Sequence, residues 1–179
     1  MKRGETVYFE KGGPQNTEAA LDAVRARVPE LKPDAVVVAT TSGRSALVAA
    51  RALADTGVRV IAVPFQKHLY DKYGPPDPEL AAQCRESGVE FLPEEPTVPM
   101  LDTHRPDIVN AWRTMSQGFK VALQVASMCV DLGMLDAGAH VIALGGSGEG
   151  ADTAVAVHTY GYDDVLKSNV TGIIAMPVA

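Results

Sequence analysis

The chain has 179 residues, of which 46% are hydrophobic, 21% charged and 6% aromatic, and its formal net charge is −6 at pH 7. A chain of this length predicts one domain spanning residues 1–179. Nucleic-acid-binding proteins carry a basic face and often stack bases on aromatic rings, so the acidic balance and the few aromatics argue against that class.

The cysteines and the N-terminal residues indicate the compartment. Cys84 and Cys129 form neither a disulfide framework nor a metal-binding spacing, so we expect both to be reduced and in or near the core. The N-terminus lacks the apolar segment of a signal peptide, and no apolar run reaches the about 18 residues of a membrane span. We therefore expect a cytoplasmic protein without a membrane partner. The histidines have no cysteine or carboxylate at ligand spacing, so no metal site is predicted.

Runs of valine and isoleucine alternate with helical patterns through the first half of the chain, which is typical of an α/β fold with a parallel sheet. The first helix is expected to begin at a cap, Asn16 or Thr17, and to end before Pro29. The next three elements are a buried strand, a helix that ends at a glycine, and a second buried strand, at residues 34–40, 43–57 and 58–64.

The second half is predicted to complete the sheet. The middle elements are a short helix, a short strand, a proline-rich loop and another helix, at 77–88, 89–92, 93–100 and 104–115. The longest helical pattern, 116–135, is apolar on several sides and is expected to be largely buried. A strand, a glycine-rich loop and a strand occupy 140–160, and a closing strand occupies 170–179. Because no long helix joins these last strands, we expect an antiparallel strand at the edge of the sheet.

The turn after the first buried strand has the composition of an anion-binding site. It supplies four hydroxyl side chains, a glycine that permits close backbone approach, and an arginine: Thr40, Thr41, Ser42, Gly43, Arg44 and Ser45. A phosphate at a helix N-terminus is bound by backbone N–H groups and favoured by the helix dipole. These residues leave two interpretations, a phosphate cradle or an ordinary strand-to-helix turn capped by a hydroxyl. Arg44 either adds a charged donor or points to solvent.

A second candidate loop, at 145–153, also follows a buried strand. Its candidate residues are Gly145, Gly146, Ser147, Gly148, Glu149, Gly150, Asp152 and Thr153. The glycines allow a ligand to lie against bare backbone, and the two carboxylates can accept hydrogen bonds from ligand hydroxyls. The loop is not a dinucleotide fingerprint, because no helix follows it. Its composition suits either a binding site or a flexible hairpin-like turn.

Gln117 and Lys120 lie at the start of the longest helix. A lysine in the first turn of a helix opposes the helix dipole, so Lys120 requires another explanation. The commoner explanation is a lysine on a solvated face, and the alternative is a lysine beside the site. No nucleophile motif and no P-loop is present, so catalytic residues are left unassigned.

The segment AVVVATTSGRSALVAARAL, followed by VRVIAVP, resembles the C-terminal domain of pyruvate kinase. In that family the corresponding turn holds a phosphate of the allosteric sugar bisphosphate. The segment HVIALGGSGEGADTAVAV is similar to a later strand, effector loop and strand of the same domain. The resemblance spans the chain from about Asp34 to its end and implies that the turn at 40–45 holds a phosphate.

Two departures from pyruvate kinase change what is expected. A chain of 179 residues has no room for the catalytic barrel, so we do not expect a pyruvate kinase. The loop at 145–153 lacks the tryptophan and arginine that clamp the second phosphate in that family, and Glu149 would repel a second anion. A monophosphate with a polyol or apolar remainder is the better match.

The fuller resemblance is to the stand-alone pyruvate kinase α/β domain proteins of prokaryotes, which carry segments like GPQNT, QGFKV and GEGADTA. That family is associated with flavin mononucleotide (FMN). Its fold is a three-layer α/β/α sandwich around a mostly parallel sheet with one antiparallel edge strand. The resemblance implies that residues 40–45 hold the phosphate, while Asp152, Thr153 and the backbone of 145–150 line the ribityl chain and the ring. It implies no particular reaction.

We therefore expect a protein that binds a phosphorylated small molecule, FMN, in a cleft between the loops at 40–45 and 145–153. One form of this hypothesis is a flavin-dependent oxidoreductase with Lys120 or Gln117 near the ring. The alternative is a non-catalytic sugar-phosphate sensor or regulatory module. A homodimer is the default expectation for its assembly.

Overall fold

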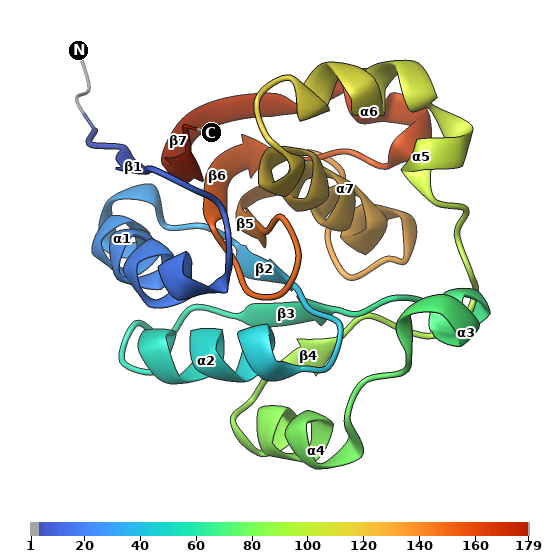
Figure 1. The fold of residues 1–179 in the computed structure, drawn as a ribbon, viewed down its shortest axis with the longest axis horizontal. Helices are drawn as coiled ribbons and strands as arrows, with labels where there is room; N and C mark the ends of the chain where they lie inside the picture. The colour runs from blue at the N-terminus through green and yellow to red at the C-terminus, as the bar shows by residue number, and fades with distance from the viewer. Residues whose placement is uncertain (1–3, 179) are drawn as a thin grey trace.

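The computed structural model describes residues 4–178 and shows an α/β protein built on a seven-stranded sheet (Figure 1). The strands lie in the order β1-β7-β6-β5-β2-β3-β4. Their bounds are β1 Val7–Phe9, β2 Ala35–Ala39, β3 Val60–Val63, β4 Glu90–Phe91, β5 His140–Gly145, β6 Thr153–His158 and β7 Asn169–Pro177. The last residue of the closing strand predicted at 170–179 lies outside the described residues.

Strand β6 is the antiparallel member of the sheet. It pairs antiparallel with β5 on one side and with β7 on the other, whereas the other neighbouring pairs are parallel. The expectation of an antiparallel strand at the edge was therefore wrong about its position. The reason is that β7 continues the sheet beyond β6, and the short strand β1 then pairs with β7 as the outermost strand. The sequence around β1 gave no strand signal, because it has only three residues and none of them is buried.

Helices cover both faces of the sheet. One face carries α1 (Thr17–Leu31), α2 (Arg44–Leu53) and α4 (Pro78–Glu86), and the other carries α5 (Leu101–His104), α6 (Pro106–Arg113) and α7 (Gln117–Asp131). The remaining helical segments are η1 (Pro14–Asn16), η2 (Lys67–Leu69), α3 (Tyr70–Tyr73) and η3 (Tyr162–Lys167). Strand β2 shows why two hydrophobic cores result, since Val36 and Val38 face one core while Ala35 and Val37 face the other.

Helix α7 packs closely against the centre of the sheet. Most of its residues are buried, as its all-round apolar pattern predicted. A side chain at Gly145 would bring a Cβ within 2.3 Å of the Gly118 carbonyl oxygen, and one at Gly118 would lie 2.3 Å from Thr153 Oγ1. Only glycine therefore permits the N-terminal turn of α7 to approach the ends of β5 and β6 so closely.

Several helix boundaries differ from the prediction. Pro29 lies inside α1 rather than beyond it, and the helix ends where Lys32 adopts a left-handed conformation with φ of 45°. The helix predicted at 104–115 is α6, which begins only at Pro106, because Arg105 precedes a proline and is disfavoured in the α conformation; the separate short helix α5 before it was not predicted. Asn16 occupies the cap position of α1 without a capping side-chain hydrogen bond. The segments η2, α3 and η3 were not predicted.

The order of the chain reverses between the neighbouring strands β2 and β5. From β2 the chain proceeds outward to β3 and β4, and it returns through α5, α6 and α7 to place β5 on the other side of β2. Open α/β sheets bind ligands in the crevice outside the carboxyl ends of their strands at such a point. The turns that follow β2 and β5 therefore flank an expected binding crevice. No helix within residues 4–178 has the length and apolar character to cross a membrane.

Candidate functional site

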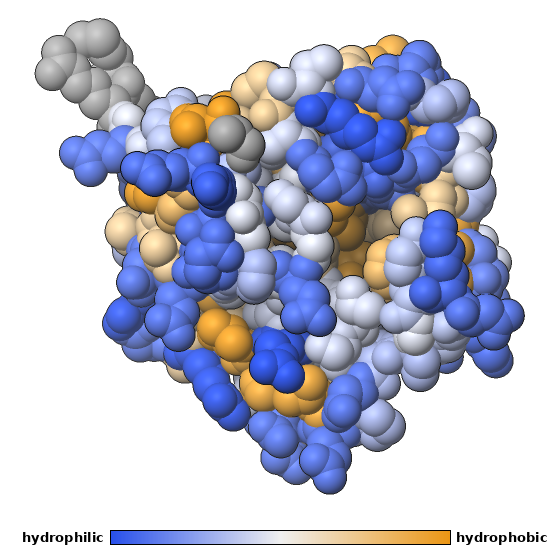
Figure 2. Space-filling view, viewed as in Figure 1, coloured by the Kyte–Doolittle hydropathy of each residue, from blue (hydrophilic) through white to orange (hydrophobic). Residues whose placement is uncertain are grey.

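A cleft of about 1080 Å³ opens where β2, β3 and β5 end, and Ala39, Val63 and Gly146 lie in its lining. Small-molecule sites in proteins typically measure about 300–1,000 Å³, so this cleft has room for one large ligand or two smaller ones. Figure 2 shows the same face hollowed near its centre, with apolar surface inside the hollow and hydrophilic surface around it.

The turn between β2 and α2 forms one side of the cleft. Its members in the lining are Thr40, Thr41, Ser42, Arg44 and Ser45. Gly43 is buried behind them and occupies the N-cap position of α2 with φ of 102°, a conformation that favours glycine. Arg44 is exposed at the rim, so both a contact with a ligand and a solvent-facing position are open to it.

Two side-chain hydrogen bonds hold this turn in shape. Thr40 Oγ1 accepts from the Gly43 N–H at 3.0 Å, and Ser42 Oγ lies 3.4 Å from the Arg44 N–H. Thr40 is buried, so the first bond is shielded from water. The predicted hydroxyls therefore have two tasks, because two of them build the turn as well as lining the cleft.

The N-terminus of α2 faces the cleft with free backbone donors. The first intrahelical hydrogen bond runs from the Leu47 N–H to the Gly43 carbonyl at 3.0 Å. The preceding N–H groups of Ser45 and Ala46 therefore have no acceptor inside the helix. Donors of this kind, together with the positive end of the helix dipole, attract an anion.

The glycine-rich loop after β5, the strand next to β2, forms another part of the cleft. Its lining residues are Gly146, Ser147, Gly148, Glu149 and Gly150. The other predicted residues of this loop, Gly145, Asp152 and Thr153, are buried outside the lining. The structure thus brings the two predicted loops to one cleft, but places Asp152 and Thr153 behind its wall.

Asp152 holds the loop together from within. Its Oδ2 accepts from Gly13 N–H at 2.9 Å, from Ser147 N–H at 3.2 Å and from Ser147 Oγ at 2.8 Å, while its Oδ1 accepts from Thr153 Oγ1 at 2.8 Å. The side chain is 1% exposed. These partners explain why the carboxylate is turned away from the cleft. Sequence reasoning expected Asp152 to contact ligand hydroxyls, but nothing in the sequence shows that Gly13 would reach it.

The segment before α1, together with the first turn of that helix, is a part of the site that sequence reasoning did not select. Pro14, Gln15, Thr17 and Glu18 lie in the lining. Thr17 Oγ1 accepts from the Ala151 N–H at 3.0 Å, which ties this segment to the glycine-rich loop. The GPQNT segment was interpreted mainly as a helix entry; its proximity to a loop far along the chain was not visible in the sequence.

Helix α7 contributes Gln117 and Lys120 to the cleft. Lys120 does not lie on a solvated face, so the commoner explanation was wrong. Its side chain is 5% exposed, and Nζ lies 2.7 Å from Asp102 Oδ2 of α5. That oxygen receives no well-directed hydrogen bond among the described residues, so the contact is principally an ion pair. Asp102 supplies the reason why a lysine is tolerated in the first turn of a buried helix.

Arg113 of α6 completes a charged cluster with Lys120 and Asp102. Its guanidinium forms an ion pair with the same carboxylate and donates to Gln117 Oε1 at 3.1 Å. Burial lowers the pKa of the Lys120 ammonium, and Asp102 only partly opposes this effect. Burial alone would raise the pKa of Asp102, but the two cations outweigh it and hold that pKa below its usual value. Asp102 is therefore ionised at neutral pH.

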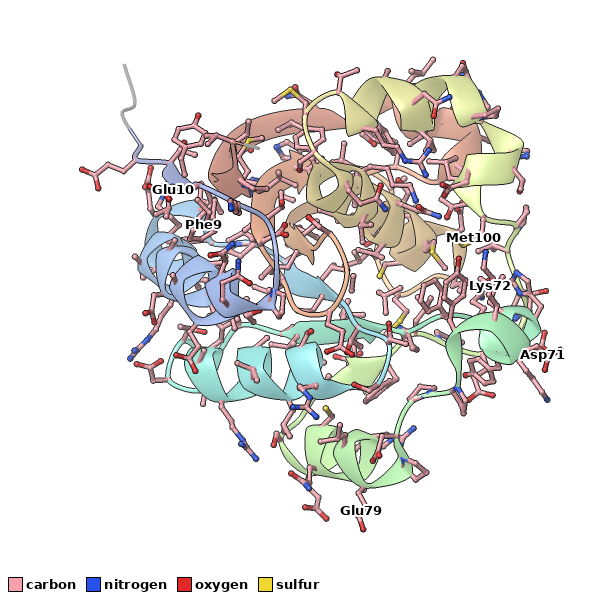
Figure 3. All side chains as sticks on the ribbon, viewed as in Figure 1. Phe9, Glu10, Asp71, Lys72, Glu79 and Met100 are labelled. Atoms are coloured by element: carbon pink, nitrogen blue, oxygen red, sulfur yellow. The ribbon has the colours of Figure 1, made fainter. Side chains whose placement is uncertain are left out.

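Apolar and aromatic residues cover much of the remaining wall. The rings of Phe65 and Tyr73 stack with centroids 4.0 Å apart and an interplanar angle of 9°. Met100 lies beside α7, with its sulfur 3.5 Å from Gln124 Nε2, and Figure 3 labels it between α7 and the α3 segment. The apolar lining also contains Val48, Val63, Val121, Val125 and Met128. A flat apolar group can be accommodated against such a wall.

The described residues contain no group of three histidine, cysteine or carboxylate side chains arranged to hold a metal ion. The lining of the cleft offers hydroxyl side chains and a charged cluster in which Lys120 is buried, Asp102 half-buried and Arg113 exposed. No family model matches the chain.

Proposed function

We propose that the protein binds a phosphorylated small molecule in this cleft and that the ligand is FMN. The strongest support is the free N-terminus of α2, which opens into a cleft that also has a largely apolar wall. The proposed relationship to the stand-alone pyruvate kinase α/β domain proteins, and to their three-layer sandwich, agrees with helices on both faces of a mostly parallel sheet.

The turn at 40–45 fits a phosphate group. Ser45 and Ala46 offer backbone N–H groups without intrahelical acceptors, and Ser42 and Thr41 offer hydroxyls in the lining. The Thr40–Gly43 hydrogen bond constrains the turn, and a constrained site lowers the entropic cost of binding. These residues would hold the phosphate.

The rest of the cleft fits a ribityl chain and a flat ring. Ser147 and Gln15 lie in the lining and would form hydrogen bonds with the hydroxyls of the ribityl chain. The ring would lie against the apolar wall near Met100. When bound, FMN supplies hydride and one-electron transfer chemistry. An oxidoreductase is therefore the activity we propose for the loaded protein, with Gln117 and Lys120 near the ring.

Glu149 limits which phosphorylated ligands are accommodated. It is exposed in the glycine-rich loop and lines the cleft, as does Glu18. A second phosphate near these carboxylates would be repelled, because like charges at close range are unfavourable. The cleft accordingly favours a monophosphate over a sugar bisphosphate.

Ligand-induced stabilisation tests this proposal directly. A ligand of the native state raises the midpoint of thermal unfolding by mass action. We expect FMN to raise the midpoint of thermal unfolding, and we expect the fluorescence of FMN to fall when it binds. Glucose 6-phosphate and fructose 1,6-bisphosphate should change the midpoint little. Stabilisation by the sugar monophosphate alone would replace the flavin proposal with the sugar-phosphate sensor. Stabilisation by none of these ligands would contradict both.

A further inference from the structure

The α7 side of the cleft carries a charged cluster that phosphate binding does not use. Asp102 on α5, Arg113 on α6 and Lys120 on α7 meet there, and all three line the cleft. Two cations and one carboxylate give the cluster a formal charge of +1. The proposed phosphate-binding turn, residues 40–45, lies at the N-terminus of α2. Helix α2 covers the face of the sheet opposite to the one that α7 covers.

Other charged residues of the lining do not belong to this cluster. Glu18, Arg44 and Glu149 come from α1, α2 and the glycine-rich loop. Among the described residues, no ion pair joins any of them to Lys120 or Arg113, both of which pair with Asp102. Asp102 is thus the single carboxylate that pairs with the two cations, Lys120 and Arg113, in the described chain.

Both cations retain donors for a further acceptor. Lys120 has an ammonium with several N–H groups but one ion-pair neighbour, and its side chain is 5% exposed. Arg113 directs Nε to Gln117, Nη1 to Asn110 and Nη2 to Asp102, so each Nη keeps a second N–H. Lys120 is buried, and a buried charge with unused donors is costly unless an anion or water completes its shell, whereas the Arg113 side chain is 40% exposed.

We propose that Lys120 and Arg113 form a subsite for the carboxylate of a small organic acid, which binds beside the phosphorylated ligand. A carboxylate matches the flat guanidinium and a cluster charge of +1, whereas Asp102 disfavours a dianion such as a second phosphate. The volume of about 1080 Å³ leaves room for a second molecule. This subsite depends on the proposed function only for the identity of the neighbouring ligand, FMN.

The subsite is tested by calorimetric titration of acetate, lactate, malate and benzoate, each compared with its neutral amide. The protein is used both alone and saturated with FMN. We expect at least one acid to bind about tenfold more tightly than its amide. Lys120→Met and Arg113→Gln should abolish that preference, while Lys120→Arg should keep much of it. Arg105→Gln is the matched control, because Arg105 pairs with Asp107 on the same helix as Arg113 and is not in the lining.

Asp102→Asn gives a readout that misfolding cannot imitate. Removing this carboxylate leaves two cations for the ligand to neutralise, so the acid should bind more tightly and stabilise the variant more than the wild type. A purely structural ion pair predicts destabilisation with no gain in binding. The proposal is overturned if no acid is preferred over its amide, if Arg105→Gln loses the preference as fully as Arg113→Gln, or if Asp102→Asn gains nothing. Parallel titration with FMN reports separately on the phosphate turn.

Discussion

Thr40 Oγ1 accepts a hydrogen bond from the Gly43 N–H at 3.0 Å and thereby closes the turn that joins β2 to α2. Thr40 is buried, and Gly43 has a φ of 102°. This hydrogen bond thus helps to hold the backbone at the start of α2, where the N–H groups of Ser45 and Ala46 have no acceptor inside the helix.

Thr40→Val removes this hydrogen bond while preserving the shape of the side chain. We expect the free energy of unfolding to fall by about 1 kcal/mol. FMN affinity should fall as well, because the turn loses its fixed conformation. The matched control is Thr56→Val at the opposite end of α2, where Thr56 Oγ1 accepts from the Val58 N–H at 3.3 Å. This control should lose stability but bind FMN normally; equal losses of binding in both variants would contradict the role assigned to Thr40.

Asp152→Asn tests the buried carboxylate behind the glycine-rich loop. Asparagine keeps one carbonyl oxygen to accept from Gly13 and Ser147, but that oxygen is uncharged, and the NH₂ group replaces the oxygen that accepts from Thr153 Oγ1. We expect the free energy of unfolding to fall by about 1 kcal/mol, since hydrogen bonds to a charged acceptor are stronger than those to a neutral one. Chemical denaturation measures this change, and Asp136→Asn at an exposed position is the control. A stability equal to that of the control would show that Asp152 does not organise the loop.

The sequence predicted much of this architecture from local patterns. Valine-rich runs marked β2 and β3, the apolar pattern marked α7, and TTSGRS marked the turn at the start of α2. These signals are local, because strand burial and helix capping depend on neighbouring residues. The two selected loops meet in one cleft, since both follow the carboxyl ends of neighbouring strands.

What the sequence did not predict depends on contacts between distant segments. Lys120 was expected in solvent because its partner, Asp102, lies on another helix. Asp152 was expected to face the ligand, because the sequence does not show that the distant Gly13 N–H donates a hydrogen bond to it. The position of β6 inside the sheet depends on its pairing with β7, and β7 in turn pairs with β1, whose three residues carry no periodic signal. Such pairings are set by tertiary packing rather than by local propensity.

Cys129 should make stability decline at alkaline pH. Burial raises the pKa of its thiol from 9.0 to about 12. Because the unfolded chain ionises first, the contribution of the neutral thiol is complete below about pH 9 and is lost as pH rises toward the folded-state value. Cys129→Ala should therefore show a smaller loss of stability between about pH 7 and about pH 10 in chemical denaturation. Leu123→Ala, another buried position of α7 without a titrating group, should keep the wild-type decline; a shared flattening would contradict the assignment.

Binding of an organic acid at the proposed subsite should weaken at alkaline pH. Burial lowers the pKa of Lys120 below 10.5, so its ammonium deprotonates earlier than that of a free lysine. Asp102 remains charged throughout this range, and Arg113 and Tyr73 also line the cleft. The measurement is the affinity of the preferred acid against pH. Lys120→Arg should flatten the profile, because arginine stays charged; an unchanged profile would assign the transition to another group.

The phosphate site is tested most directly by comparing FMN with riboflavin, which differs from it only by the phosphate. Isothermal titration calorimetry on the wild type and on Gly43→Ala separates the phosphate contribution from that of the ring. Gly43→Ala strains a backbone with φ of 102°, whereas Gly57→Ala, with φ of 68° and nothing within 4 Å of the added Cβ, is the matched control. We predict that the wild type and Gly57→Ala bind FMN about tenfold or more tightly than riboflavin, and that Gly43→Ala loses most of this difference. Equal affinity of the wild type for FMN and riboflavin, or no binding of either, would contradict the assignment of the α2 N-terminus as a phosphate site.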